Sequence, residues 1–311
     1  MKTKKALIIV MLLMTMFLTG CTSYLKDDKK AVVKNPETGQ NIVKNILCKT
    51  ENEVNNEIYD KYKVDLSKVP ECKSYNPAKG KYEGIWNSVF VKPLAWLIIK
   101  VGYLVKNFGL AIILITLAIR LLLVPFTKKA AMQSENMKLV KPELDKLERK
   151  YKGKDDQESM MQKSQEMLML YKKYNINPAA GCVFSMIQLP LFIAFYEALY
   201  RLPVVFEGKF LAFDLGFSPL AAIMSGKIYY IILVILVVLV TYYSFKLNAG
   251  ASMGEAQESQ MKMMRYITIV MIGFASFRVS VAIALYWITN SGFTVLQNLI
   301  VKKESAQNVR R

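Results

Sequence analysis

The sequence of 311 residues contains no histidine. Catalytic triads and dyads that use imidazole, HExxH zinc sites and histidine proton relays all require that side chain, so the sequence excludes them. A serine–lysine dyad is not excluded on this ground, but no lysine lies within a clear membrane-spanning stretch. We therefore expect a protein that is not an enzyme, with no catalytic residues, no bound metal and no cofactor.

Cysteine is also scarce, with four in the chain. Cys182 begins an apolar helix and is expected to behave as a small hydrophobic residue. Cys48 and Cys72 fall in a polar stretch that would lie in an oxidising space, where they could form a disulfide or remain two thiols. The fourth, Cys21, belongs to a different kind of segment.

The first 21 residues have the pattern of a lipoprotein signal peptide. A basic start precedes an apolar run at 6–17, which is too short to span a membrane. The tetrad Leu18-Thr19-Gly20-Cys21 resembles the bacterial lipobox, whose cysteine is acylated and becomes the new N-terminus. We therefore expect removal of residues 1–20 and a lipid anchor, such as palmitate, on Cys21. The alternative is a chance cysteine after an ordinary signal peptide.

Acidic residues are absent from the first long apolar stretch, residues 108–127, although this stretch contains Arg120. A cation held in hydrocarbon costs at least about 2.5–3.5 kcal/mol, so Arg120 should face water or protein. Thr116 lies one helical turn earlier, which makes that face polar. The alternative is that Arg120 snorkels to the interface, but Thr127 lies roughly 10 Å further along, near the limit of the side chain's reach. Arg120 is therefore a candidate functional residue.

Hydrophobic residues make up 53% of the chain and come in long blocks, which indicates an all-α integral membrane protein. Five spans are predicted at about 108–127, 181–200, 228–246, 264–279 and 281–301. With the N-terminus outside, five crossings place the basic tail, residues 304–311, in the cytoplasm, in agreement with the positive-inside rule. The formal net charge of +18 suits segments near anionic lipid, ribosomes or nucleic acid, and charge alone does not separate these partners.

Two polar or mixed segments precede the first span. Residues 21–84 are rich in Lys, Asn, Asp and Glu, and we expect a small or partly disordered segment outside the cell. Residues 85–107 are apolar but interrupted by Lys92, Lys100 and Lys106, which predicts an amphipathic helix on the outer interface. A tilted spanning helix is the weaker alternative.

Residues 128–180 form the first predicted cytoplasmic loop. Dense charge mixed with apolar positions, a break near Gly153 and a second helical pattern from 157 to 174 predict a helical hairpin, with Asp155 or Asp156 as the helix cap. Its methionines either pack within the hairpin or form an adaptable surface for apolar segments. A second methionine cluster near the fourth span favours the surface. The two clusters are Met160, Met161, Met167 and Met169, and Met261, Met263 and Met264.

Three ordered passages between residues 86 and 303 resemble the YidC family of membrane protein insertases. They are NPAAGC at 177–182 followed by IQLPLFIAFY at 187–196, LITLAIR at 114–120 followed by PFTK at 125–128, and LYWITN at 285–290. The external segment and lipobox resemble the form found in single-membrane bacteria. The chain departs from the family at residues 277–282, where members often carry Pro-Ser-Gly, and near Thr241, where some members have a glutamine.

The resemblance implies five transmembrane helices, within an insertase core at 108–303, that enclose a water-filled hydrophilic groove open to the cytoplasm and to lipid. The residues that match the family's groove positions are Arg120, Thr116, Gln188, Phe192, Tyr286, Trp287 and Asn290. Of these, Phe192, Tyr286 and Trp287 match positions that contact the incoming segment, and Gln188 either faces the groove or packs between helices. The implied partners are nascent membrane proteins, membrane lipids, and the ribosome and Sec translocon, without sequence-specific binding of nucleic acid. The implied location is the bacterial cell membrane.

The expected function is therefore that of an insertase or chaperone, which moves nascent hydrophobic segments from the cytoplasm into the bilayer, alone or with the Sec translocon. The main alternative is a small-solute transporter or channel. A secondary transporter should show repeated halves and several ionisable groups within its spans. No repeat is visible, and Glu197 is the only acidic residue that the predicted spans contain. A lipid-anchored structural protein would not explain Arg120.

Overall fold

The protein is described by a computed structural model that covers residues 22–80, 82–154, 156–177, 180–248 and 254–309. Cys21 and the rest of the signal peptide lie outside the described residues. The chain divides into two compact units. The first comprises Met1–Thr116, Leu189–Val234 and Ala275–Trp287, and the second comprises Leu117–Gln188, Ile235–Phe274 and Ile288–Arg311.

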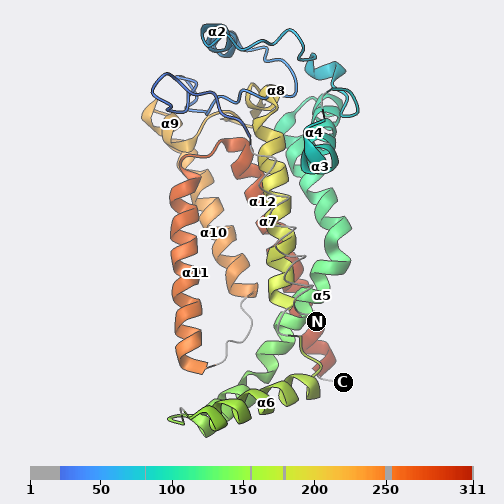
Figure 1. Ribbon diagram of the computed structural model, residues 1–311, viewed down its shortest axis with the longest axis vertical. Coiled ribbons are helices and arrows are strands. Elements are labelled where there is room, and N and C mark those ends of the chain that lie inside the picture. Colours follow the sequence, from blue (N-terminus) through green and yellow to red (C-terminus); the bar gives the residue numbers. More distant parts are fainter. Residues whose placement is uncertain (1–21, 81, 155, 178–179, 249–253, 310–311) are drawn as a thin grey trace. The chain divides into compact units, whose positions relative to one another are not determined.

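The described residues contain five long helices (Figure 1). They are α5 (Phe108–Tyr151), α7 (Ala180–Tyr200), α10 (Ile231–Asn248), α11 (Gly254–Ser276) and α12 (Val281–Val309). Each contains or largely overlaps one of the five predicted spans. The long apolar blocks therefore did mark the positions of the main helices.

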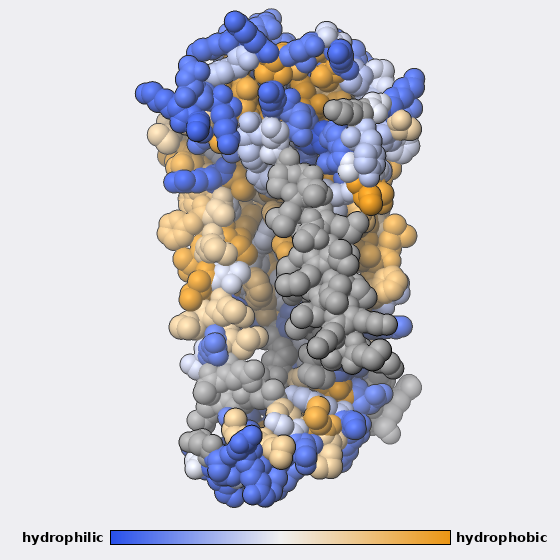
Figure 2. All heavy atoms as spheres, in the orientation of Figure 1, coloured by the Kyte–Doolittle hydropathy of each residue, from blue (hydrophilic) through white to orange (hydrophobic). Residues whose placement is uncertain are grey.

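Three helical segments of the described residues are long and apolar enough to cross a membrane: Gly84–Leu104, Phe108–Tyr151 and Ile228–Asn248. The prediction of a helical membrane protein is confirmed. Exposed apolar side chains also follow α11, as the left edge of Figure 2 shows, and they include Ile267, Met271 and Phe274. The full set of five crossings stays a prediction.

The segment Gly84–Leu104 combines α3 (Gly84–Trp86), η2 (Asn87–Val91) and α4 (Lys92–Leu104). Its buried face includes Leu94, Ile98 and Ile99, which lie three to four residues apart as expected for a helix packed on one side. Its length and composition suit a spanning helix as well as the predicted interfacial one. The interfacial position therefore stays a prediction.

Residues 22–83 form a small folded segment, whereas the sequence suggested one that was small or partly disordered. Isolated bridges pair Tyr24 with Val43 and Lys34 with Asn41, and the Tyr59 hydroxyl donates to the Val43 carbonyl at 2.7 Å. The helix α2 (Glu53–Lys61) begins at Asn52, whose side chain accepts from the Asn55 amide. Its small core contains Leu25, Ile42, Val43, Ile46, Leu47 and Tyr59. Composition alone missed this core because its members are scattered among charges.

A disulfide joins Cys48 to Cys72, with their Cα atoms 4.7 Å apart. The bond holds η1 (Cys72–Ser74), and the Lys49 amide donates to the Pro70 carbonyl beside it at 3.0 Å. Of the two states that the sequence left open for these cysteines, the structure has the disulfide. The bond closes a loop with a sequence separation of 24 residues.

Replacing both Cys48 and Cys72 with alanine should destabilise residues 22–83 by roughly 3 kcal/mol, because a disulfide restricts the unfolded chain. Limited proteolysis of the purified protein would measure this as faster cleavage within the segment. Reductant should accelerate cleavage of the unmodified protein but not of the double variant, and Cys182→Ala should behave as the unmodified protein. Equal cleavage of all variants would contradict a stabilising disulfide.

The loop between α7 and α10 contains only short helices and strands and is held by hydrogen bonds and ion pairs. It contains α8 (Pro203–Phe206), the antiparallel pair β1 (Lys209–Phe210) and β2 (Phe213–Asp214), α9 (Pro219–Met224) and η3 (Ile228–Tyr230). Asp214 pairs with Lys209 at 3.2 Å and Lys227 at 2.9 Å. Burial opposes ionisation of Asp214, but these two ammonium groups outweigh it and lower the pKa of the carboxyl.

The same loop fixes the turn into α12, where the chain departs from the Pro-Ser-Gly pattern. The amides of Val281 and Ala282 donate to the carbonyls of Phe217 at 2.9 Å and Leu215 at 3.1 Å. The Leu220 amide donates to the Phe277 carbonyl at 2.8 Å. Backbone hydrogen bonds to the loop therefore hold this turn in place.

The helix α5 is a single element of 44 residues, which continues past the predicted end of the first span (Figure 1). Its second half packs on α6 (Gln157–Lys173) through a core of Val140, Leu144, Tyr171 and Ile176. Asp156, one of the two predicted caps, accepts the Ser159 amide at 2.8 Å at the start of α6. Apolar residues continue beyond the predicted end of the first span, and in the second half of α5 they pack in the hairpin core.

The methionines of this hairpin divide between the two interpretations. Met167 packs against the hairpin core. Met160, Met161 and Met169 are 56%, 59% and 60% exposed. Figure 2 shows the result as hydrophobic side chains scattered over a hydrophilic hairpin. Of the four methionines of the first cluster, Met167 therefore packs within the hairpin, as Met137 of α5 also does, and the other three are exposed to solvent.

Candidate functional site

Arg120 lies buried in the second unit, with 2% of its surface exposed. Its Nε donates to Asn290 Oδ1 on α12 at 2.6 Å, and its terminal nitrogen Nη2 donates to Gln188 Oε1 on α7. These two acceptors are neutral amide oxygens, which satisfy N–H donors without cancelling the charge. Arg120 therefore lies among helices and not along the surface of α5, and Gln188 and Asn290 are its direct partners.

Three polar pairs join α5 to α12 in this unit: Arg120 with Asn290, Thr127 with Gln297, and Lys128 with Glu304. The Gln297 amide donates to Thr127 Oγ1 at 2.9 Å, and Lys128 Nζ lies 2.8 Å from a Glu304 carboxylate oxygen. Residue numbers rise together along both helices, so the two helices run parallel. In a membrane protein, parallel direction means that an odd number of crossings separates them, as it would for the first and fifth of five spans.

Thr116 lies at the end of the α5 portion that belongs to the first unit, and it is 1% exposed. Its hydroxyl donates to the Ile112 carbonyl one turn earlier, at 2.7 Å. The Thr116 hydroxyl therefore donates its hydrogen bond within α5. A role for Thr116 at the site stays a prediction.

The predicted aromatic residues meet within the first unit. The Phe192 ring centroid lies 5.3 Å from that of Trp287, edge to face, and 6.1 Å from that of Tyr286. Tyr286 is 1% exposed and stacks on Phe195 at 4.4 Å, so it packs in the core. Phe192 and Trp287 are half-buried. Of the three aromatic residues predicted to contact an incoming segment, these two have accessible ring surface.

Sequence reasoning missed the continuation of this aromatic cluster along α7. The Tyr196 ring lies 6.1 Å from Phe192 and 4.5 Å from Tyr200, and the Tyr24 and Tyr196 hydroxyl oxygens are 2.7 Å apart. The signal was present, because residues 192, 196 and 200 are spaced by four and so share one helix face. The cluster attaches the start of residues 22–83 to α7.

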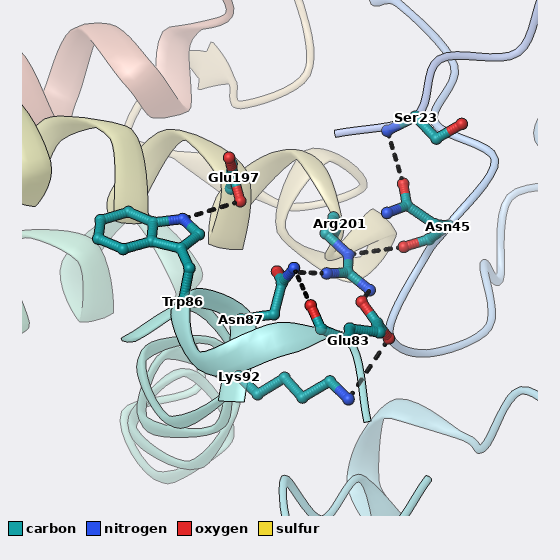
Figure 3. Close-up of polar contacts among 8 residues, drawn as sticks. All are labelled: Ser23, Asn45, Glu83, Trp86, Asn87, Lys92, Glu197 and Arg201. Carbon is teal, nitrogen blue, oxygen red and sulfur yellow. Dashed lines mark hydrogen bonds and ion pairs between the residues drawn. The ribbon is translucent and has the colours of Figure 1, made fainter. Parts of the chain in front are cut away.

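A buried ion cluster in the first unit was also missed (Figure 3). Arg201 is 2% exposed and reaches Glu83 at 2.7 Å, Asn87 Oδ1 at 2.9 Å and the Asn45 carbonyl at 2.7 Å. Lys92, which interrupts the apolar run in the sequence, lies 3.4 Å from the other Glu83 oxygen. Charges that must be buried need partners, and this cluster ties residues 22–83 to α4 and α7.

The sequence is similar to those of known proteins of one family. A family profile described as 60Kd inner membrane protein matches residues 100–308. The "Membrane protein insertase YidC" of Oceanobacillus iheyensis is 37% identical over 75% of this chain and 90% of its own length. The chain belongs to the YidC family. A second YidC, from Alkalihalophilus pseudofirmus, is 38% identical over 71% of this chain and 83% of its own length. "Membrane protein insertase MisCA" of Bacillus subtilis is 37% identical over 70% of this chain and 79% of its own length.

Membership of the YidC family agrees with several sequence expectations. The protein is a bacterial membrane protein of an insertase family, and that family is not one of enzymes. The match covers the five long helices and the hairpin, while residues 22–99 precede it. The recognition from three short passages is thus confirmed over the part of the chain that carries Arg120, Phe192 and Trp287.

Proposed function

We propose that this protein inserts nascent hydrophobic segments into the lipid bilayer, and that Arg120 attracts the polar or acidic tail of each segment. The observation that carries the proposal is the hydrogen bonding of Arg120, a buried cation held by the neutral side chains of Gln188 and Asn290. Such an arrangement holds the guanidinium at a defined position among the helices, where an incoming carboxylate could accept hydrogen bonds from it.

The exchange of partners at Arg120 favours an acidic client. Hydrogen bonds between two charged groups are roughly twice as strong as those to neutral acceptors. Charge interaction is also stronger in a low-dielectric wall than in bulk water. A client carboxylate can therefore displace the amide oxygens of Gln188 and Asn290, which then remain as hydrogen-bonding partners for other polar groups of the tail.

Release into the bilayer follows from burial of apolar surface. Phe192 and Trp287 offer accessible ring surface to the hydrophobic part of the client. Burial of each apolar side chain in lipid contributes about 1.5–3 kcal/mol, so the client itself supplies the driving force. We propose that water around Arg120 shortens the hydrocarbon that the polar tail must cross, and that neither a nucleotide nor an ion gradient is needed.

The proposed topology has the N-terminus outside and the C-terminus in the cytoplasm, with the α5–α6 hairpin on the cytoplasmic side. The parallel course of α5 and α12 supports this arrangement. The exposed methionines Met261, Met263 and Met264 on α11 would lie on the same side as those of α6. We propose that these surfaces receive hydrophobic clients, either from a ribosome directly or beside the Sec translocon.

Site-specific crosslinking of a stalled nascent membrane protein tests the proposal. Photoreactive side chains at 192 and 287 should give adducts with the client's hydrophobic segment. A photoreactive group at 195 is the matched control, because Phe195 lies on the same helix as Phe192 but is 0% exposed. Adducts of equal yield at all three positions, or none at 192 and 287, would contradict client contact. Depletion that abolishes solute uptake while small membrane proteins still insert would favour the transporter alternative.

A lipid anchor on Cys21 is a further part of the proposal. Cys21→Ala should leave an unacylated precursor that retains residues 1–20, because the signal peptidase for lipoproteins acts next to an acylated cysteine. Intact-mass spectrometry distinguishes the precursor from the mature form. A mature, unmodified protein that begins elsewhere, in the unmutated chain, would disprove the anchor.

A further inference from the structure

A pocket of about 420 Å³ lies in the first unit between η1 and α4. Lys73, Ser74 and Tyr75 line it from η1 and the residue that follows, and Trp96 and Lys100 line it from α4. Trp96 and Lys100 are one helical turn apart and so lie on one face of α4. The pocket therefore combines two cations, a hydroxyl and an indole.

The two ammonium groups of the pocket are available to a ligand. Lys73 and Lys100 are exposed, and neither forms an ion pair within the described part of the chain. Lys73 Nζ lies 5.6 Å from the Tyr103 ring centroid, which keeps it next to α4. The acidic residue just before η1, Glu71, is used by Lys49 at 3.3 Å. The pocket is therefore complementary to an anion.

The position of η1 is fixed by its surroundings. The disulfide from Cys48 to Cys72 ends at the residue next to Lys73. Tyr75 is 5% exposed, and its burial raises the pKa of its hydroxyl to about 12, which keeps this lining residue neutral. A pocket built on a fixed backbone loses less conformational freedom when it binds a ligand.

An exposed apolar stripe runs along α4 and η2 beside the pocket. Phe90, Leu97 and Leu104 are spaced by seven residues and are 50%, 40% and 79% exposed. Spacing by seven keeps side chains on nearly the same helix face. In a membrane protein such a stripe is covered by acyl chains, whether the helix crosses the bilayer or lies on its surface. Trp96 adjoins the stripe, and tryptophan is enriched at the level of lipid headgroups.

We propose that this pocket binds the headgroup of an anionic phospholipid, with the phosphate between Lys73 and Lys100 and the acyl chains along the stripe. Ser74 can donate its hydroxyl to a phosphate oxygen, and Trp96 covers the junction of headgroup and chain. The lipid would thereby fix the helix α4 and residues 70–77 at one depth in the membrane. This site is separate from Arg120 and from client insertion.

Native mass spectrometry of the full-length protein in detergent, titrated with phosphatidylglycerol or phosphatidylcholine, tests the proposal. Phosphatidylglycerol should bind more tightly than phosphatidylcholine. Lys73→Gln with Lys100→Gln should weaken phosphatidylglycerol binding about thirty-fold, as expected for the loss of two lysines near an anionic surface. The matched control is Lys29→Gln with Lys68→Gln, which removes the same charge from exposed positions outside the pocket.

Three results would overturn the proposal. Equal binding of the two lipids would show that headgroup charge is not recognised. Equal loss in the pocket and control variants would show a general charge effect. Displacement of the lipid by millimolar inorganic phosphate would identify a free anion, and not a lipid, as the ligand. Thermal unfolding of both variants in the same detergent shows whether either has lost its fold, and Lys100→Gln alone, which should weaken binding several-fold, provides a second test.

Discussion

Arg120→Ala should slow insertion of clients with acidic translocated tails by roughly tenfold or more. A hydrogen bond to a charged group contributes about 1.5–3 kcal/mol, and about 1.4 kcal/mol corresponds to a factor of ten. Clients with neutral tails should be affected much less, because they gain little from the charge. Arg120→Lys keeps a cation and should retain much of the activity, although a single ammonium cannot donate to two acceptors in the fixed geometry of a guanidinium. A reconstituted insertion assay with matched acidic and neutral tails measures the difference.

Protein abundance must be matched in this assay, since Arg120 also holds α7 and α12 through Gln188 and Asn290. Gln188→Leu serves as the structural control, because it removes one of those hydrogen bonds but leaves the positive charge. It should lower stability without creating a preference between tails. Equal defects of Arg120→Ala for acidic and neutral tails, or no defect at all, would refute the capture mechanism.

Removal of the hairpin tip should abolish insertion while the five long helices remain folded. A deletion of residues 142–170, closed by a flexible linker, removes Leu144 from the hairpin core, most of α6 and the exposed methionines. It leaves Lys138, whose ammonium donates to the Leu247 carbonyl at 2.8 Å and ties α5 to the end of α10. Protease resistance of the remaining helices reports folding, and the insertion assay reports function. Normal insertion by the deleted protein would show that the hairpin is not needed.

Point variants separate client contact from hairpin stability. Changing the exposed Met160, Met161 and Met169 together to serine should reduce insertion several-fold and leave the hairpin folded. Met167→Ser alone is the matched control, because Met167 packs against the core and its loss should destabilise the hairpin by about 1–3 kcal/mol. If the triple variant inserts clients normally, the methionines have no receiving role.

Local patterns predicted the parts of the fold that depend on neighbours in the sequence. Apolar blocks located the five long helices, and Asp156 was recognised as a cap because its position before α6 is a local feature. Arg120 could be singled out because a lone cation in an apolar stretch requires an explanation. Gln188 and Asn290 were named from the family resemblance as groove residues and not as partners of Arg120, because they lie 68 and 170 residues away from it in the sequence.

The features that the sequence did not predict depend on contacts between residues that are far apart in the sequence. Lys92 was treated as an interruption of an amphipathic helix, yet Glu83 and Arg201 make it part of a buried cluster. Residues 22–83 were expected to be small or partly disordered, and the sequence did not show which of their scattered apolar side chains pack together in the small core. Tyr286 was expected at a contact surface, but Phe195 on another helix covers it. Sequence periodicity contains no information on such partners.

The contacts of Arg201 also set an order for biosynthesis. The loop closed by Cys48 and Cys72 is complete once its own residues have been made. Arg201, whose Nε donates to the Asn45 carbonyl, lies 156 residues after Asn45 in the sequence. At about 5–20 residues per second, the ribosome needs roughly 8 to 30 s to supply that arginine. During this interval residues 22–83 lack the ion pair of Glu83 and the hydrogen bond of the Asn45 carbonyl with Arg201. We therefore expect the disulfide to restrict the chain of this segment before Arg201 is available to it.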